Sequence, residues 1–306
     1  MRHVISLFDL TADEIRTVLD LSIKLKQQLR DGEREPLMQQ KTMGLLFQKP
    51  SLRTRVSFET LFNQMAGSTM FLSGDVGWNT REPVQDFMPI LTGYLDLLVI
   101  RAKNHNDVVE AAQFSQCPII NGLTDVSHPC QALADVMTVM ELCDSPQETL
   151  ITYVGDANNV AYSLAVCCSR LGIRLNIAAP AGYQFESSFI SSLNVESGND
   201  FISQTDDPRA AVENASFIYT DVWTSMGQEA ENEKRVKDLA DYQVNEELFK
   251  VAADGARLLH CLPARRGEEV TSSVIDSPDS AVIEQADNRL HAQKGLVVWL
   301  MDQVQE

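Results

Sequence analysis

The sequence lacks several features that would assign it to a familiar class of protein. No uninterrupted apolar stretch among its 306 residues approaches membrane-spanning length, which excludes a transmembrane helix. The six cysteines are scattered without C-x-x-C spacing, so they predict neither a disulfide framework nor a zinc site. Basic residues are scarce, since 25 lysines and arginines face 43 acidic residues and leave a net charge of −18. A field of that sign repels nucleic acid and anionic lipid, so we expect neither as a partner.

The glycine-rich motifs of nucleotide-binding enzymes are also absent. The segment QKPSLRTRVSFETLF (48–62) follows a predicted strand but lacks the glycines and the lysine of a Walker loop. The segment VGDANN (154–159) starts a helix after a strand but lacks the G-x-G-x-x-G pattern. We therefore expect no nicotinamide cofactor.

Length and composition are those of a globular protein, with 44% hydrophobic and 22% charged residues. A chain of 306 residues exceeds what one hydrophobic core usually serves, so we expect two domains of about 150 residues each. The first residues, MRHVISLFDLTADE, have neither the apolar core of a secretory signal nor the Arg- and Ser-rich character of a transit peptide. We therefore expect a cytoplasmic protein.

Short apolar runs alternate with helical periodicity along the whole chain. An amphipathic helix over 11–29, opened by Thr11 and Asp13, comes first. The predicted strands cover 42–47, 69–74, 95–102 and 117–122 in the first half, and 150–156, 173–180, 216–222 and 257–263 in the second half. This alternation is typical of βαβ units around a largely parallel sheet.

The domain boundary is predicted near Ser145 and Pro146, which form a turn after a helix over 128–143. A final helix from about residue 288 to residue 304 is expected to return to the first domain. The predicted domains are 1–140 together with 287–306, and 141–286. The fold class is therefore α/β, with two doubly wound parallel-sheet domains, an active-site cleft between them and a C-terminal helix returning to the first.

The segment 48–62 carries the clearest indication of a binding site. Ser51 is a candidate N-cap for a helix whose first turns carry Arg53, Thr54 and Arg55. A helix N-terminus carries partial positive charge, so arginines there are disfavoured unless a bound anion offsets them. The alternative is that both arginines extend into solvent or pair with acidic neighbours. The coincidence of strand end, helix start, hydroxyl groups and guanidinium groups favours a phosphate or carboxylate site.

Two more strand ends of the first domain carry polar residues. Arg101 closes the apolar strand VIRA, and HPCQALAD (128–135) places His128 at a strand-to-helix junction with Gln131 one turn later. Open α/β sheets bind ligands at the carboxyl ends of their strands, which favours a functional role for these residues. Taken singly, His128 is explained equally well by a structural role, whereas an arginine that ends an apolar strand, as Arg101 does, favours a functional role over the alternative of an internal ion pair.

Polar residues follow the strands of the second domain as well. Asp156, Asn158 and Asn159 are in isolation best explained as helix caps. Asp221 ends a strand before the glycine-containing segment TSMGQE (224–229), which favours recognition of a substrate amine over ordinary turn residues.

The segment HCLPARRGEEV (260–270) places Cys261 at another strand end. Adjacent residues of a strand point to opposite faces, so His260 is poorly placed to activate Cys261 as a nucleophile. We expect instead a polar contact from Cys261 and a contribution from the backbone carbonyl of Leu262. Arg289, in NRLHAQK (288–294), either stays at the surface or returns toward the anion site.

These motifs together resemble one known family. SLRTR, HPCQALAD, VGDANN, DVWTSMGQE, HCLPARRGEEV and NRLHAQK, in this order and spacing, are similar to the aspartate/ornithine carbamoyltransferases, and the Ser-Met-Gly segment points to the ornithine branch. The resemblance covers essentially the whole chain. It implies transfer of the carbamoyl group of carbamoyl phosphate to the δ-amine of L-ornithine, giving L-citrulline and phosphate without a cofactor, in arginine biosynthesis or in citrulline breakdown.

The resemblance also implies a role for each matching residue. Carbamoyl phosphate would be bound by Ser51, the backbone of Leu52, Arg53, Thr54, Arg101, His128, Gln131 and Arg289, with Cys261 and Leu262 at the carbamoyl group and the reacting amine. Ornithine would be held by Asn159, Asp221, Ser225 and Met226. Catalysis would involve Arg101, His128, Cys261 and Asp221. The amine proton could pass to Asp221, to Cys261 or to the phosphate.

Two positions depart from the family pattern. Leu52 stands where the family usually has threonine, which removes one hydroxyl group but keeps the backbone N–H. Trp78 lies in GDVGWNTREPVQD (74–86), a segment that in the family reaches a neighbouring subunit's site and would there contact carbamoyl phosphate. A tryptophan here resembles the enzymes that use N-acetyl- or N-succinyl-ornithine, whereas the alternative is a ring packed on its own subunit. The intact segment from Ser225 to Gly227 favours free ornithine.

The resemblance further implies a homotrimer in which Trp78 is lent to the adjacent site. A non-catalytic regulatory member of the family is the remaining alternative. The retention of nearly all matching site residues argues against it.

Overall fold

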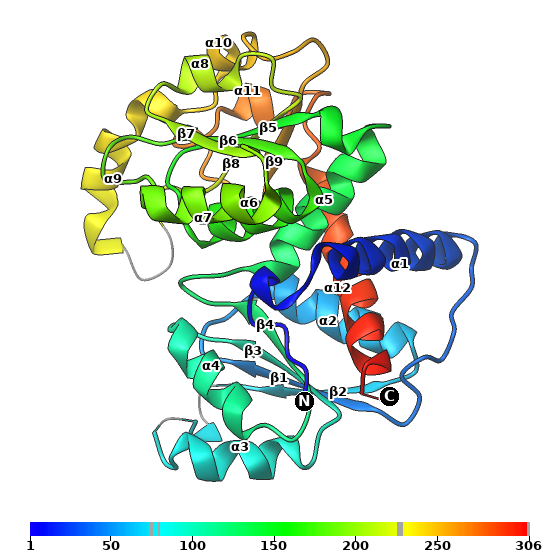
Figure 1. Cartoon of the computed structure of the whole chain (residues 1–306). Coiled ribbons are helices and arrows are strands. Elements are labelled where there is room, and N and C mark those ends of the chain that lie inside the picture. Colours follow the sequence, from blue (N-terminus) through cyan, green and yellow to red (C-terminus); the bar gives the residue numbers. More distant parts are fainter. Residues whose placement is uncertain (74–75, 79, 225–228, 305–306) are drawn as a thin grey trace. The chain divides into compact units, whose positions relative to one another are not determined.

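Two parallel β-sheets with flanking helices form the computed structural model, which describes residues 1–73, 76–78, 80–224 and 229–304 (Figure 1). The chain divides into two compact units, one of Met1–Met137 with Asn288–Glu306 and one of Thr138–Asp287. The division falls inside two helices, α5 (Pro129–Leu142) and α12 (Val282–Asp302). The predicted α/β fold is confirmed.

The sheet of the first unit contains four parallel strands in the order β2-β1-β3-β4. Its strands are β1 (Thr42–Phe47), β2 (Ser68–Leu72), β3 (Leu97–Arg101) and β4 (Ile119–Leu123). Its other elements are η1 (Leu7–Asp9), α1 (Ala12–Arg30), α2 (Leu52–Gln64), α3 (Val84–Thr92) and α4 (His105–Phe114). Every residue of β3 is buried, as expected for a parallel strand covered on both faces.

The sheet of the second unit contains five parallel strands in the order β7-β6-β5-β8-β9. Its strands are β5 (Leu150–Val154), β6 (Arg174–Ala178), β7 (Ile202–Thr205), β8 (Phe217–Thr220) and β9 (Arg257–His260). Its helices are η3 (Pro146–Glu148), α6 (Asn159–Leu171), α7 (Ser187–Ser197), α8 (Pro208–Val212), η4 (Glu229–Glu231), α9 (Asn232–Asp238), η5 (Ala240–Tyr242), α10 (Glu246–Phe249) and α11 (Ser272–Ile275).

Each sheet has one point at which the strand order reverses. In the first unit the chain runs from β1 outward to β2 and then returns to place β3 on the other side of β1. In the second unit it runs from β5 through β6 to β7 and returns to place β8 beside β5. Open α/β sheets bind ligands at the carboxyl ends of the strands beside such a switch point. The ends of β1 and β3, and those of β5 and β8, are therefore the places to look for a site.

The C-terminal helix α12 packs closely against α1 within the first unit. A Cβ atom at Gly295 would lie 2.0 Å from Ser22 Oγ and 2.7 Å from the Val18 carbonyl oxygen, so only glycine fits there. Lys26, which is 4% exposed, donates to Asn288 Oδ1 at 2.7 Å. The expected return of the last helix to the first domain is confirmed.

Two predictions about elements were wrong. β7 was missed because its sequence, ISQT, is short and half polar and carries no apolar run. The final helix begins at Val282 rather than near residue 288, because 282–287 continue the helical turn without a break. No helix among the described residues has both the length and the apolar character needed to cross a membrane.

Candidate active site

The helix α2 begins directly after β1, at the switch point of the first sheet, as the sequence predicted. Ser51 is its N-cap, because Ser51 Oγ accepts a hydrogen bond from the Thr54 backbone N–H at 3.3 Å. The same hydroxyl group donates to Thr54 Oγ1 at 3.0 Å. The N–H groups of the first helical turn thus open at the edge of the sheet where Arg101 ends β3.

Thr54 brings two buried arginines together. Arg101 Nη1 lies 3.4 Å and Arg289 Nη2 lies 3.5 Å from Thr54 Oγ1. Arg101 is 6% exposed and Arg289 is 4% exposed, although Arg289 is far away in the sequence. Of the two interpretations that the sequence left for Arg289, return toward the α2 N-terminus is the one that the structure shows. The arrangement concentrates positive charge beside a helix N-terminus, which suits an anion.

Gln131 and Asp135 extend this group along α5. Arg289 Nη1 donates to Gln131 Oε1 at 2.6 Å, and Gln131 Nε2 donates to Asp135 Oδ1 at 2.7 Å. Because Asp135 accepts from the amide nitrogen, the amide oxygen of Gln131 is turned toward Arg289. The sequence singled out Gln131 but did not single out Asp135, although i,i+4 spacing on one helix gave a signal for the pair.

His128 lies fully buried at the start of α5, among the same cations. Burial lowers the pKa of His128 well below its usual 6.5, and the nearby guanidinium groups of Arg289, Arg101 and Arg53 lower it further. The imidazole is therefore neutral near pH 7, with one N–H group as a donor. A neutral donor beside two arginines is suited to polarising a carbonyl oxygen.

Three predicted residues of this unit lie less directly at the cluster. The Leu52 side chain is exposed, so what this residue offers at the helix start is its backbone N–H. Arg55 pairs with Glu59 at 3.0 Å and lies over the Phe71 ring. For Arg55, pairing with an acidic neighbour, the alternative to a role in an anion site, is therefore what the structure shows. Trp78 is 5% exposed and belongs to its own chain's hydrophobic core, where its Nε1 has no hydrogen-bond partner among the described residues.

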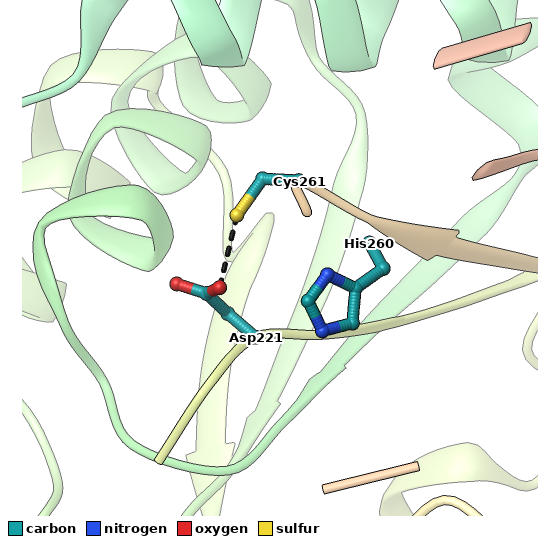
Figure 2. Close-up of side chains that lie close together, drawn as sticks. All are labelled: Asp221, His260 and Cys261. Carbon is teal, nitrogen blue, oxygen red and sulfur yellow. Dashed lines mark hydrogen bonds between the residues drawn. The ribbon is translucent and has the colours of Figure 1, made fainter. Parts of the chain in front are cut away.

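The second group of predicted residues lies at the switch point of the other sheet. Asp221 follows β8 and is 6% exposed. The Cys261 sulfur donates to Asp221 Oδ1 at 2.9 Å, and Figure 2 shows the Cys261 side chain directed at that carboxylate. The polar contact expected for Cys261 is therefore present. Asn158 Nδ2 donates to Asp221 Oδ2 at 2.8 Å, so both carboxylate oxygens are held.

The capping expected of the VGDANN residues is found at Asn158, while Asp156 and Asn159 have other positions. Asn158 caps α6 and also holds Asp221, whereas Asn159 is the first residue of α6 and is half-buried. Asp156 pairs with Arg235, a buried residue of α9 that the sequence did not single out. Nothing in the acidic segment around Arg235 distinguishes it from a surface cation, so it carried no signal. Ser225 and Met226 lie outside the described residues.

His260 is bonded to groups other than Cys261. His260 Nδ1 accepts from the Leu262 backbone N–H at 2.9 Å, and Nε2 lies 3.1 Å from Glu269 Oε1. Because Nδ1 is an acceptor, Nε2 carries the proton and donates it to Glu269. Leu262 has a φ of 54°, a left-handed conformation that the contact with His260 supports.

Asp221, His260 and Cys261 form a group, among the described residues, whose potential ligand atoms lie within 4.8 Å of one another. A zinc site in a protein usually has four ligands, each with a free lone pair. Both nitrogens of His260 are engaged with Leu262 and Glu269, and Cys261 is bonded to Asp221. The arrangement is better suited to holding Asp221, through Cys261, and the Leu262 backbone, through His260, than to binding a metal ion.

Comparison with known proteins decides the family. Residues 2–141 match the model of the carbamoyl-P binding domain of aspartate/ornithine carbamoyltransferase, and residues 147–300 match its Asp/Orn binding domain. The chain belongs to the aspartate/ornithine carbamoyltransferase family. The ornithine carbamoyltransferase of Caldicellulosiruptor saccharolyticus is 45% identical over 304 residues, which cover 98% of each chain.

Solved structures of this carbamoyltransferase family share the fold over nearly the whole chain. The ornithine carbamoyltransferase from Pyrococcus furiosus superposes with a TM-score of 0.94 at 43% identity, covering 98% of this chain and 97% of that one. The anabolic ornithine carbamoyltransferase from Campylobacter jejuni superposes with a TM-score of 0.92 at 32% identity, covering 99% of this chain and all of that one. Arg289 lies in the segment that matches the Asp/Orn binding model, yet in space it belongs to the first unit.

Proposed function

We propose that this protein transfers the carbamoyl group of carbamoyl phosphate to the δ-amine of L-ornithine, giving L-citrulline and phosphate. The observation that carries the proposal is the cluster in which Arg101 and Arg289 converge on Thr54 beside a neutral, buried His128. The relatives named ornithine carbamoyltransferase, similar over almost the full chain, support the choice of reaction.

The phosphate of carbamoyl phosphate would bind at the start of α2. The backbone N–H groups of the first turn, including that of Leu52, favour an anion, and the side chains of Ser51, Arg53 and Thr54 add hydrogen bonds and charge. Arg289, oriented by Gln131, would complete the binding of this substrate. Such a local cluster is needed because the protein as a whole carries a charge of −18.

The carbonyl group of the substrate would be activated by Arg101, His128 and Thr54. Attack of the neutral amine on the carbonyl carbon places negative charge on the carbonyl oxygen, and preorganised donors stabilise that charge. Phosphate then leaves with the bonding electrons. The leaving group is already activated, so positioning and electrostatics are sufficient and the reaction needs no cofactor.

The second unit would bind the amine substrate. Asp221 is the carboxylate for the cationic substrate, assisted by Asn159, Ser225 and Met226, while Cys261 and the Leu262 carbonyl would contact the reacting groups. The bond from Cys261 to Asp221 supports joint action of these two residues. The amine proton is accepted by Asp221, either directly or through the Cys261 thiol as it passes its own proton to Asp221, or by the departing phosphate.

Trp78 was the residue that raised the alternative of an acylated ornithine. Its ring is buried in the core of its own chain, so contact with carbamoyl phosphate on a neighbouring subunit requires the ring to leave that core. No other observation favours an acylated substrate. We also propose that the enzyme is cytoplasmic, acts in arginine synthesis and forms a homotrimer.

Citrulline formation from carbamoyl phosphate tests the function directly. Ornithine, N-acetyl-ornithine, N-succinyl-ornithine and aspartate should be assayed side by side with the purified chain. We expect turnover with ornithine and no measurable product with the other three. A preference for an acylated amine or for aspartate would overturn the substrate proposed here.

A further inference from the structure

Arg235 is a buried cation that joins three separate segments of the second unit. It is 6% exposed, and its Nε donates to the Trp223 carbonyl oxygen at 2.5 Å. Its Nη2 donates to Asp156 Oδ2, and its guanidinium carbon lies 5.0 Å from the centre of the Tyr183 ring. One side chain therefore connects the end of β5, the segment after β8 and the segment after β6.

The contacts of Arg235 lead to the proposed amine site on both sides. Trp223 is two residues beyond Asp221 and two residues before Ser225. On the other side of the segment 225–228, Glu231 Oε2 lies 3.6 Å from Arg235 Nη1. The backbone oxygen of Asp156 accepts from the Asn158 N–H at 2.7 Å, and Asn158 in turn holds Asp221. Arg235 thus holds the flanking residues of this segment and the loop that orients Asp221.

We propose that Arg235 is a positioning residue for the amine substrate: its pairing with Asp156 and its bond to the Trp223 carbonyl hold Asp221 in the arrangement that receives the amine. The inference rests on the proposed function of Asp221. A guanidinium group suits this task because its planar fork donates in several fixed directions at once, whereas an ammonium group is a single point charge.

The charge state of Asp156 gives this arrangement a distinctive dependence on pH. The pKa of Asp156 is raised to about 6, mainly by burial. The neighbouring carboxylates of Asp221 and Glu231 contribute to the rise, and Arg235 opposes it. The other titratable groups at this place are Tyr183, whose hydroxyl bonds Asp238, and Cys261, which bonds Asp221. Protonation of Asp156 removes the charge that holds Arg235. Ornithine binding should therefore weaken as pH falls through about 6.

Steady-state kinetics of the full-length protein test the proposal with the variants R235M, R235K, D156N and R266M. Arg266 is the matched control, because it pairs with Asp276 through two bonds of 2.6 and 2.7 Å in the same unit but is exposed. KM and kcat should be measured for ornithine and for carbamoyl phosphate between pH 5.5 and pH 8, and folding should be checked by thermal unfolding.

We expect R235M to raise KM for ornithine by about tenfold or more, which is the value of a charge-assisted hydrogen bond, while KM for carbamoyl phosphate changes less than about twofold. The wild type should show a break in ornithine kcat/KM near pH 6, and R235M and D156N should lack it. R235K should keep the break, with a KM for ornithine between those of the wild type and R235M. If R235M does not fold, the comparison of R235K with the wild type tests the proposal. R266M should match the wild type throughout.

Each contrary result has one meaning. If the wild type forms citrulline from ornithine and R235M or R235K has the same ornithine KM as R266M, the positioning role is wrong. Equal losses for both substrates without a change in the pH profile would indicate a purely structural role and would also overturn it. Absence of citrulline from the wild type would instead overturn the proposed function itself.

Discussion

At the scale of single residues, burial decides the chemistry of His128. The pKa of this imidazole is lowered because water is excluded and because Arg289, Arg101 and Arg53 repel a proton. In solvent the same side chain would be partly charged near pH 6.5 and would compete with the arginines for the anion. As a neutral donor it can instead share the developing oxyanion with them.

Replacement of Arg53 by alanine tests the anion site. We expect kcat/KM for carbamoyl phosphate to fall by about a hundredfold or more, as for loss of one preorganised donor, while stability changes little because Arg53 is only half-buried. Arg55→Ala is the control, since Arg55 pairs with Glu59 at the surface. Arg55→Ala should retain wild-type activity in the citrulline assay. The assignment of an anion site at Arg53 is wrong if Arg53→Ala retains it as well.

The lowered pKa of His128 predicts how stability varies with pH. The unfolded chain takes up a proton on this residue below pH 6.5, whereas the folded chain does not, so the unfolded state binds more protons there. The free energy of unfolding should therefore be highest above pH 6.5 and fall as the solution is acidified. His128→Gln should reduce that slope by up to about 1.4 kcal/mol per pH unit.

Urea unfolding between pH 5 and pH 8 measures the slope. His105→Gln is the control, because burial also lowers the pKa of His105 but Asp125 and Asp9 partly offset the effect. A smaller change is expected for that variant. An unchanged slope in His128→Gln would show that this imidazole takes up a proton in the folded protein.

At the scale of elements, the sequence predicted where most strands end. It did not predict the edge strand β7 or which side chains meet at the strand ends. The apolar runs ending at Phe47 and Arg101 carried a clear signal, because parallel strands that are buried on both faces read as nearly continuous hydrophobic runs. β7 carried none, since an edge strand as short as ISQT is held by pairing with β6 rather than by its own composition. Asn158 reaches Asp221 because helix capping turns its side chain back toward the strand end.

Packing between α1 and α12 depends on Gly295. Gly295→Ala should lower the free energy of unfolding by about 1–3 kcal/mol, the usual cost of overpacking, because the new methyl group would overlap Ser22 Oγ and the Val18 carbonyl oxygen. Adding Ser22→Ala should recover only part of the loss, since the carbonyl contact remains. Chemical denaturation of the wild type and the two variants measures this, and a neutral Gly295→Ala would contradict the close approach.

At the scale of the whole molecule, the family resemblance implies a homotrimer. The structure of one chain does not test this. We expect light scattering after gel filtration to give a mass three times the 34.1 kDa of the chain. A monomer with full activity would contradict both the trimer and the sharing of Trp78 between subunits. Fluorescence of Trp78 on addition of carbamoyl phosphate, with Trp78→Phe as the control, reports whether this ring leaves its core.

The sequence by itself determined the α/β class and the parallel strands other than β7, because those follow from local apolar runs alternating with helical periodicity. Its motifs also indicated the family. The anion site was foreseeable around Ser51, since arginines at a helix start conflict with the helix dipole unless an anion is bound. Only the tertiary structure decided that Arg289 joins Arg101 at Thr54, that Asp156 pairs with Arg235, and that Trp78 lies in the core. Those contacts link residues that are far apart in the chain. Local sequence patterns do not show which distant residues come together when the chain folds.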